Sequence, residues 1–405
     1  MRISLLLERE PFGQILAATL ARYWTERLGT TVDVRWAPET ESPPPGALTW
    51  YCNPRLNTIF TADATSAVFG PARREFARAI SPLRRPAQAL YVRLATSSAF
   101  AKRIAWPALY VTPAIPDASS TSILGGNNRI RLINFRTSES HVVAKEGFDS
   151  DLIAHELDVR TGSSTLAPKI TFVDKARRWF TEECIAGTPL NRLASSATNR
   201  ASLSRASTAL HELHQSTQTE TPLANHASAL ETQINALAQA HPWLTDAMRS
   251  TIQTLTDTIT TTIDSLVTAV PNIQIAQTHG DFQPANILVS GNDVWQIDWE
   301  YTAQRHITYD PLVYHLQARS PVGLAQRFKA LSDGSTLDAL NVAWPWFPWD
   351  APEQRIGSLV IFLLEELVFR LEESNNPMFY GLDPGVPNYL SELQEAVDHL
   401  PTALL

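Results

Sequence analysis

The sequence is poor in cysteine and has no excess of positive charge, and each shortage excludes a class of protein. Two cysteines, Cys52 and Cys184, occur in 405 residues, and they lie far apart. A disulfide framework or a zinc site needs more cysteines, so we expect two reduced thiols in a cytoplasmic protein. A net charge of −8 at pH 7 lacks the basic footprint of nucleic-acid-binding proteins, so no nucleic-acid partner is expected.

Long apolar runs are missing as well. No stretch reaches the roughly eighteen apolar residues that cross a bilayer, so no transmembrane segment is expected. The apolar run at the N-terminus ends at Glu8, Arg9 and Glu10, which makes it shorter than the apolar region of a signal peptide. Hydrophobic residues still make up 44% of the 405 positions. The chain therefore has enough apolar material for the cores of two or three domains.

Residues 1–115 have the pattern of a small α/β unit. Residues 3–7 form an apolar run that predicts a buried strand, and residues 12–28 repeat apolar side chains at helical spacing. Two further strands are expected at 32–36 and 48–52. The role of this N-terminal extension is open.

A basic run lies within this extension and continues toward its end. It has two interpretations: a surface for an anionic partner, such as a phosphorylated substrate or a membrane, or a solvated face that balances the acidic remainder. Its basic residues are Arg73, Arg74, Arg78, Arg84, Arg85, Arg93, Lys102 and Arg103, and Glu75 is the acidic residue among them.

The rest of the chain divides into a sheet-rich part and a helical part. Residues 116–187 contain short strands with one early helix at 151–160, which fits a small, mostly antiparallel sheet. Residues 188–405 are mainly helical, apart from short strands around a loop at 274–299. We therefore expect an α+β fold with a small sheet lobe, a larger helical lobe and a cleft between them.

The strongest chemical signal is the run THGDFQPANIL at residues 278–288, followed by Ile-Asp-Trp-Glu at 297–300. Phosphoryl transfer needs one carboxylate to meet the acceptor hydroxyl and take its proton, together with oxygen ligands for magnesium. Asp281 can supply that carboxylate, and Asn286 and Asp298 can supply the oxygen ligands.

The spacing of these residues also predicts that they converge. Gly280 permits an unusual backbone angle beside Asp281, and Pro284 stiffens the loop. The two short apolar runs at 287–289 and 294–297 are separated by Ser-Gly-Asn-Asp, which predicts a hairpin that returns Asp298 to the neighbourhood of Asn286.

These motifs resemble the catalytic and metal-binding segments of the aminoglycoside phosphotransferase and choline kinase superfamily, which is related to protein kinases. The resemblance implies a bilobal kinase-like fold that uses ATP and Mg²⁺. It assigns catalysis to Asp281 and the metal to Asn286 and Asp298, with a small hydroxyl compound as acceptor. Four fixed residues and a correctly spaced second motif make this a specific signal.

Lys145 is interpreted within this frame. Val-Val-Ala-Lys at 142–145 resembles the kinase strand whose lysine contacts the α- and β-phosphates, although alone it reads as an ordinary lysine at the end of a strand. Its expected carboxylate partner is Glu156, on a helix that Ser150 can cap. The interval from Lys145 is short for the family, so Asp149 and Asp151 are rivals.

Two further segments are assigned to the nucleotide by position. Gly125, Gly126 and Asn127 lie where the family places a turn over the phosphates, and a plain hairpin turn is an equal alternative. Residues 180–187 resemble the hinge between the lobes, where backbone groups near Glu183 and Ile185 would pair with the adenine edge.

The acceptor is not determined by the sequence. Trp-Pro-Trp-Phe-Pro-Trp at residues 344–349 is either an aromatic cage for a quaternary ammonium, a platform for a sugar, or a packing anchor. Glutamates at 365, 366, 372 and 373 would suit a polycationic aminoglycoside, but their spacing is typical of a salt-bridged helix surface.

The sequence thus predicts an ATP- and Mg²⁺-dependent phosphotransferase acting on the hydroxyl of a small molecule: an amino alcohol, a sugar or an aminoglycoside-like compound. The alternative is a catalytically silent kinase-like module that binds nucleotide and regulates. Transfer of a nucleotidyl group would use much the same residues. Oligomeric state is not predicted.

Overall fold

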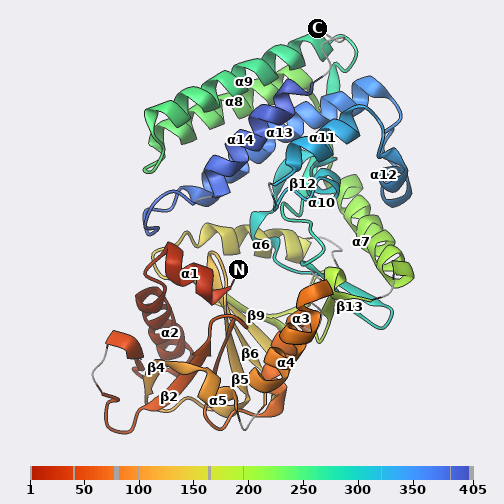
Figure 1. The fold of residues 1–405 in the computed structure, drawn as a ribbon. Helices are drawn as coiled ribbons and strands as arrows, with labels where there is room; N and C mark the ends of the chain where they lie inside the picture. Colours follow the sequence, from red (N-terminus) through yellow and green to blue (C-terminus); the bar gives the residue numbers. More distant parts are fainter. Residues whose placement is uncertain are drawn as a thin grey trace.

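The structure is a computed structural model that describes residues 2–39, 42–76, 82–97, 100–162, 166–194, 196–320, 322–383 and 385–400. Sheet dominates the first part of the chain and helices dominate the second (Figure 1). The expected α+β class with antiparallel sheets is therefore confirmed. Arg78 of the basic run and the C-terminal residues 401–405 lie outside the described residues.

The large sheet has nine strands in the order β1-β4-β2-β3-β5-β6-β7-β9-β8. β3 pairs with β5 through Ile59 and Ile123, so the strands of the N-terminal extension continue directly into those of residues 116–187. The division at residue 115 stays a prediction, but the sheet itself crosses that position. Its strands are β1 (Asp33–Trp36), β2 (Leu48–Asn53), β3 (Thr58–Thr61), β4 (Trp106–Thr112), β5 (Thr121–Gly125), β6 (Arg129–Asn134), β7 (Glu139–Ala144), β8 (Ile170–Val173) and β9 (Trp179–Glu183).

The expected strand at residues 3–7 is wrong, because this segment is helical. Ile3 and Leu6 are fully buried while Leu5 is half exposed. Burial therefore repeats every three residues, the spacing of one helix face, rather than every two as in a strand. The helices of this part are α1 (Ile3–Arg9), α2 (Phe12–Leu28), α3 (Gly70–Phe76), α4 (Arg85–Ala95), α5 (Ala101–Ile104) and α6 (Asp151–Gly162).

The N-terminal helices and the sheet share one hydrophobic core. Leu6 of α1 and Leu16 of α2 pack in the same cluster as Trp50, Ile130 and Val143 from three strands. Burying a side chain of this size contributes about 2 kcal/mol. The N-terminal extension therefore shares its main core with the sheet-rich part, and a smaller cluster around Leu56, Phe76 and Val92 lies within the extension itself.

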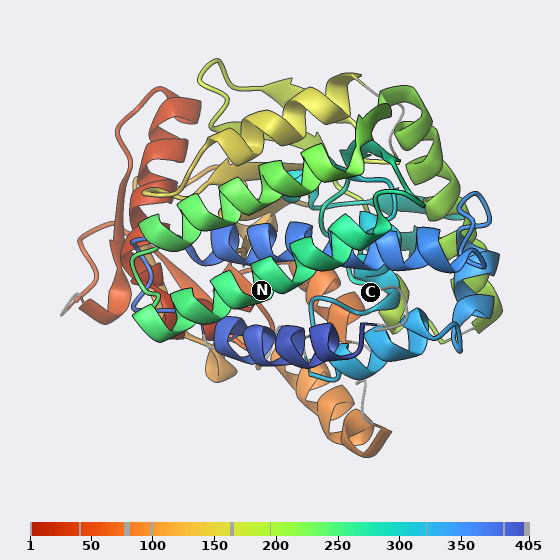
Figure 2. The same cartoon turned by 90° about the horizontal axis from the view of Figure 1, so that it is seen from above.

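Helices pack around one central helix in the second part of the chain. α13 is buried on all sides, because α8, α9, α10, α11 and α14 contact it (Figures 1 and 2). Among the described residues, none of the helices is both long and apolar enough to cross a membrane. The helices are α7 (Ser196–Thr217), α8 (Leu223–Ala240), α9 (Asp246–Leu266), α10 (Tyr309–His315), α11 (Leu324–Ser332), α12 (Leu337–Ala343), α13 (Pro352–Ser374) and α14 (Gly385–Asp398).

Two small three-stranded sheets lie within the second part of the chain. One contains β10 (Thr188–Pro189), β13 (Ile287–Ser290) and β14 (Asp293–Gln296), and the other contains β11 (Thr219–Pro222), β12 (Asn272–Thr278) and β15 (Ala303–His306). The loop between β12 and β13 carries the predicted catalytic motif. The hairpin predicted at 287–297 is confirmed, with Ile287 opposite Gln296.

Candidate active site

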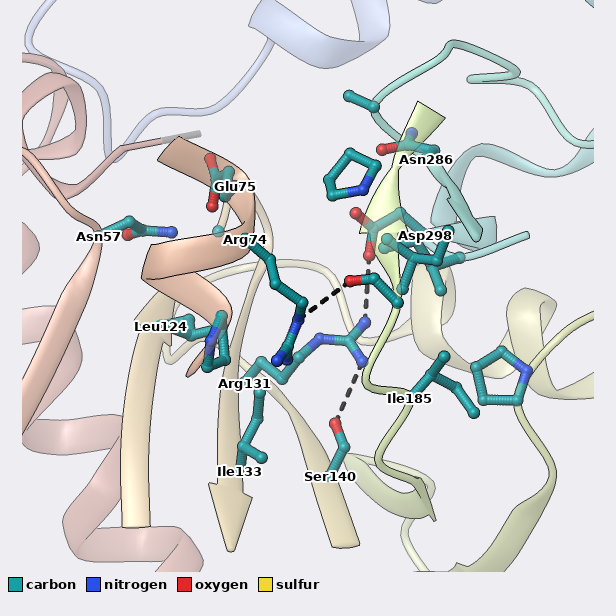
Figure 3. Close-up of a pocket in the computed structure, with 18 of the residues that line it drawn as sticks. Asn57, Arg74, Glu75, Leu124, Arg131, Ile133, Ser140, Ile185, Asn286 and Asp298 are labelled. Atoms are coloured by element: carbon teal, nitrogen blue, oxygen red, sulfur yellow. Dashed lines mark hydrogen bonds and ion pairs between the residues drawn. The ribbon is translucent and has the colours of Figure 1, made fainter. Parts of the chain in front are cut away.

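A cavity of about 470 Å³ lies between the large sheet and the loop that follows β12. Arg131 and Ser140 line it from β6 and β7, and Asn286 and Asp298 line it from the opposite side (Figure 3). Asp281 also lines this cavity. The structure therefore brings together the three residues in which the sequence placed the chemistry. A volume of this size is typical of small-molecule sites.

One carboxylate oxygen of Asp281, Oδ2, is held by two side chains of its own loop. Asn286 Nδ2 donates to Oδ2 over 2.7 Å and to the Asp281 carbonyl over 3.0 Å. Gln283 Nε2 donates to the same Oδ2 over 2.8 Å. These contacts fix the direction of the carboxylate within its own loop.

Gly280 has the unusual backbone angle that the sequence predicted, with φ of +83°. A Cβ at this position would lie 1.9 Å from the carbonyl oxygen of Tyr301. Glycine is therefore required both by the left-handed conformation and by the close approach of another backbone segment.

The hairpin returns Asp298 to Asn286. The amide of Ile297 donates to the Asn286 carbonyl over 3.0 Å, and both Asn286 and Asp298 reach the cavity. Asp298 itself adopts a left-handed conformation, with φ of +64°. A non-glycine residue in this region is strained and persists where its surroundings enforce it, often at functional sites.

Asp310 holds the backbone of the loop that carries Asp281, a role that the sequence did not predict. Its fully buried carboxylate accepts hydrogen bonds from the amides of His279, over 2.6 Å, and Gly280, over 2.9 Å. Burial raises the pKa of Asp310, although these partners oppose the shift. The residue lies well beyond the motif in the sequence, and no local pattern singles it out.

Arg319 is a second residue that the sequence did not reveal. Its Nε donates to Asp281 Oδ1 over 2.7 Å, and its Nη2 donates to the Gly280 carbonyl over 2.7 Å. Burial alone would lower the pKa of Arg319, but Glu366, Tyr309 and Asp281 raise it well above its ordinary value. Arg319 therefore stays charged and orients Asp281.

Two arginines from β6 face the same cavity. Arg129 Nη2 and Arg131 Nη2 both donate to Asp298 Oδ1, over 2.7 Å and 3.1 Å. Arg129 also pairs with Glu156, and Arg131 pairs with Glu182. Burial alone would raise the pKa of Asp298, but the two arginines lower it to about 2. Their alternation along a strand, which places both on one face, was a signal that could have identified them.

The expected pair of Lys145 with Glu156 is not formed. Lys145 is fully buried and pairs with Glu10. Glu156 pairs instead with Arg129 and, over 2.7 Å, with Arg160. The reason is position: the side chains of β6 that face the cavity reach α6, whereas Lys145 follows the end of β7 and points to the N-terminal segment. Neither Lys145 nor Glu156 lines the cavity.

The glycine turn lines the cavity through Gly125, Gly126 and Asn127 and connects β5 to β6. Asn57 holds it by two hydrogen bonds: its Oδ1 accepts from the Gly125 amide over 3.1 Å, and its Nδ2 donates to the Gly125 carbonyl over 3.0 Å. Lys145 Nζ donates to the Asn127 carbonyl over 2.6 Å. The turn is thus fixed by Asn57, which also lines the cavity, and by Lys145, which does not.

Glu183 and Ile185 line the cavity at the segment where the sequence placed the hinge. The Glu183 amide donates to the Lys169 carbonyl over 3.0 Å. Arg74 of α3 closes the cavity beside this segment, and its Nε donates to the Gly187 carbonyl over 3.1 Å (Figure 3). The N-terminal extension therefore contributes to the wall of the site.

The donor set suits magnesium. Asn286 uses its Nδ2 toward Asp281, so its side-chain Oδ1 is the atom that could hold a cation, together with the carboxylate of Asp298 in the same cavity. Magnesium takes one or two protein oxygens and completes its shell with water and phosphate. Within the described ranges no cluster of three or more His, Cys, Asp or Glu residues is arranged to hold a metal.

The aromatic segment at 344–349 packs away from this cavity. Trp344 and Trp349 are fully buried, and Phe347 is nearly so. None of its described side chains lines the cavity. The packing interpretation of this segment fits the structure, and an aromatic cage at the cavity does not.

The site has the composition of a phosphoryl-transfer centre: a loop carboxylate, an amide and a second carboxylate in one cavity. Residues 161–340 match the profile of the phosphotransferase enzyme family (APH). The resemblance to the aminoglycoside phosphotransferase and choline kinase superfamily is thereby confirmed. A comparison with curated proteins finds no match.

Several solved structures are similar to this chain. A choline/ethanolamine kinase family protein from Mesorhizobium loti is 15% identical, with 71% of this chain and 92% of that chain covered and a TM-score of 0.44. Plasmodium vivax ethanolamine kinase is 14% identical, with 78% of this chain and 89% of that chain covered and a TM-score of 0.47. An aminoglycoside phosphotransferase from Streptomyces rimosus is 16% identical, with 62% of this chain and 94% of that chain covered and a TM-score of 0.38. With TM-scores below 0.5, these likenesses decide nothing about the acceptor.

Proposed function

We propose that this protein is an ATP- and Mg²⁺-dependent kinase that phosphorylates a hydroxyl group of a small molecule. The fold is proposed to be a bilobal kinase-like one, with the nucleotide between the sheet and the helical part. Asp281 meets the acceptor hydroxyl, and Asn286 and Asp298 hold magnesium. The backbone near Glu183 and Ile185 receives the adenine, and the turn at Gly125, Gly126 and Asn127 covers the phosphates.

The observation that carries this proposal is the convergence of Asp281, Asn286 and Asp298 on one cavity. In the transfer, the acceptor O–H bond breaks, its proton passes to Asp281, an O–P bond forms to the γ-phosphorus, and ADP leaves with the bridging oxygen. A positioned carboxylate of this kind accelerates proton transfer by about 10² to 10⁴. Magnesium, when bound, neutralises charge on the phosphate oxygens.

The neighbours of Asp281 prepare it for this role. Arg319 and Asn286 each hold one of its two oxygens, so the carboxylate does not rotate away from an acceptor. Positioning of this kind supplies much of the catalysis in phosphoryl transfer. The acceptor itself is proposed as an amino alcohol, a sugar or an aminoglycoside-like compound.

The test is a mass-spectrometric phosphorylation screen with ATP and Mg²⁺. The panel holds choline, ethanolamine, hexoses, amino sugars and aminoglycosides, and Asp281→Asn serves as the blank. Asp293→Asn is the matched control, because Asp293 is an exposed residue at the hairpin turn of the same motif. A product heavier by one phosphate, present with the wild type and Asp293→Asn and absent with Asp281→Asn, supports the proposal.

Two other outcomes would replace it. Magnesium-dependent ATP binding without turnover on a broad acceptor panel would identify a silent nucleotide-binding module. A product heavier by AMP would identify nucleotidyl transfer by the same residues.

A further inference from the structure

We propose that Arg129 and Arg131 of β6, and not Lys145, are the cations that bind the phosphate chain of the nucleotide. This inference rests on the proposed function and names the residues that the nucleotide would contact on the sheet side. It changes the assignment that the sequence pattern gives to the Val-Val-Ala-Lys strand.

The position of the two arginines supports the proposal. Both line the cavity that contains Asp281, Asn286 and Asp298. They are two residues apart on β6, so their side chains leave the same face of the sheet. The side chain of Arg131 is 21% exposed, whereas that of Arg129 is 6% exposed. A ligand in the cavity therefore has direct access to Arg131.

Both guanidinium groups are paired with carboxylates and still line the cavity: Arg129 contacts Glu156, Asp298 and Glu300, and Arg131 contacts Glu182 and Asp298. Arg129 and Arg131 share one oxygen of Asp298, the proposed magnesium ligand, so both guanidinium groups lie beside the metal site. Ser140 accepts from Arg131 Nη1 over 3.1 Å and, with Glu182, holds its plane. A guanidinium fixed in this way presents a planar fork of donors, which matches phosphate oxygens better than an ammonium does.

The three N–H donors of Lys145 already have acceptors. An ammonium has three donors. Those of Lys145 are accounted for by Glu10, by the Asn127 carbonyl over 2.6 Å and by the Gly126 carbonyl over 3.4 Å. Reaching a phosphate would break a fully buried ion pair and leave Glu10 with the longer contact to Arg9, over 3.3 Å, which is unfavourable. Its role is to hold the glycine turn against the N-terminal segment.

The experiment measures binding of Mg²⁺-ADP and of adenosine by isothermal titration calorimetry. The ratio of the two dissociation constants isolates the contribution of the phosphates from that of the base. We expect Arg131→Gln to weaken ADP binding about 10- to 100-fold and to change adenosine binding by less than about threefold, because a charge-assisted hydrogen bond is lost. Arg129→Gln is expected to act in the same direction.

Two variants serve as comparisons. Arg136→Gln makes the same change in the exposed turn after β6, outside the cavity, and should match the wild type. Glu10→Gln/Lys145→Met replaces the buried pair that holds the glycine turn with neutral groups, and it should change the ratio of ADP to adenosine affinity less than Arg131→Gln does. If Arg129→Gln does not fold, the more exposed Arg131 decides the question.

The outcomes separate this inference from the proposed function. If the wild type binds Mg²⁺-ADP, Arg131→Gln keeps that affinity and the Lys145 double variant loses it, the inference is overturned and the kinase proposal stands. If the wild type binds neither ADP nor ATP with Mg²⁺, the proposed function fails and this inference fails with it.

Discussion

The two walls of the cavity are held together in different ways. On the loop wall, Asp281 is fixed by side chains two and five positions away, Gln283 and Asn286. On the sheet wall, Arg129 joins Glu156 and Asp298, which are 27 and 169 positions away. Local backbone geometry builds the first wall, and ion pairs between distant segments build the second. Substitutions that alter the backbone conformation should therefore disrupt the loop wall. Substitutions that remove a charge should disrupt the sheet wall.

The largest effect should come from a methyl group added to the loop wall. Gly280→Ala places a Cβ against the Tyr301 carbonyl in a left-handed conformation, so we expect activity to fall at least about 100-fold and stability by about 3 kcal/mol. Gly291→Ala is the control, because Gly291 has φ of +59° but no atom near its added Cβ. It should cost about 1 kcal/mol. Equal costs in urea unfolding would contradict the steric argument.

Removing the buried charge of Lys145 should destabilise the protein without a steric change. Lys145→Met removes the closer of the two cations of the buried Glu10 and leaves Arg9, over 3.3 Å, so we expect a loss of about 2 to 3 kcal/mol in the free energy of unfolding. Glu10→Gln/Lys145→Met should recover much of this loss. Denaturant unfolding of both variants checks the prediction, and an equally unstable double variant would refute it.

Glu156 tests the sheet wall through pH. Burial alone would raise its pKa, but Arg129 and Arg160 lower it below its ordinary value of 4.5. The stabilisation is therefore present above about pH 4.5 and is lost as pH falls through the folded-state pKa. Glu156→Gln should cost about 3 kcal/mol near pH 7, and its difference from the wild type should shrink below pH 4.5. Urea unfolding across pH checks this against exposed Glu353→Gln; a pH-independent difference would contradict it.

Arg319 is a charged residue that contacts the loop wall. It therefore tests whether the loop wall depends on charge as well as on backbone geometry. Arg319→Gln removes the ion pair to Asp281 Oδ1, and we expect kcat to fall about 10- to 100-fold with ATP affinity unchanged within about threefold. Arg319→Lys restores the charge without the planar fork and should recover part of kcat. Arg327→Gln, whose guanidinium contacts backbone carbonyls away from the cavity, is the control. A change confined to ATP affinity would show that Arg319 does not position Asp281.

The smallest effect on nucleotide affinity is expected from α3, the helix of the N-terminal extension that lines one side of the cavity. Arg74→Ala removes one hydrogen bond to the Gly187 carbonyl, so nucleotide affinity should fall about threefold. Arg73→Ala changes the neighbouring arginine, which bonds to Thr96 and does not line the cavity. Calorimetric titration with ADP compares the two, and equal affinities would mean that α3 does not contribute to the site.

The loop wall could be read from the sequence because its information is local. Gly280, Asp281 and Asn286 lie within seven positions, and a short hairpin brings Asp298 back to them. Turn residues and strand patterns describe such distances well. The roles of these residues as catalyst and ligands stay predictions until activity is measured.

The sheet wall could not be read in the same way. The motif around Lys145 fits a kinase strand, but the strand ends one residue before it and the side chain turns toward Glu10. Arg129, Arg131 and Arg319 take partners from distant segments, and a single sequence does not specify such pairings. The strand expected at residues 3–7 failed for a related reason, since a short apolar run fits a helix as well as a strand.

The direct pairing of β3 with β5 has a consequence for how the molecule can be divided. A fragment that begins at residue 116 would have β5 as an open edge and would expose the face of the sheet that α1 and α2 cover. Unpaired strand edges and uncovered apolar faces promote aggregation. We therefore expect the first 115 residues and the sheet that follows to unfold in one cooperative transition, so that trimming the chain to its recognisable kinase motifs yields an insoluble product.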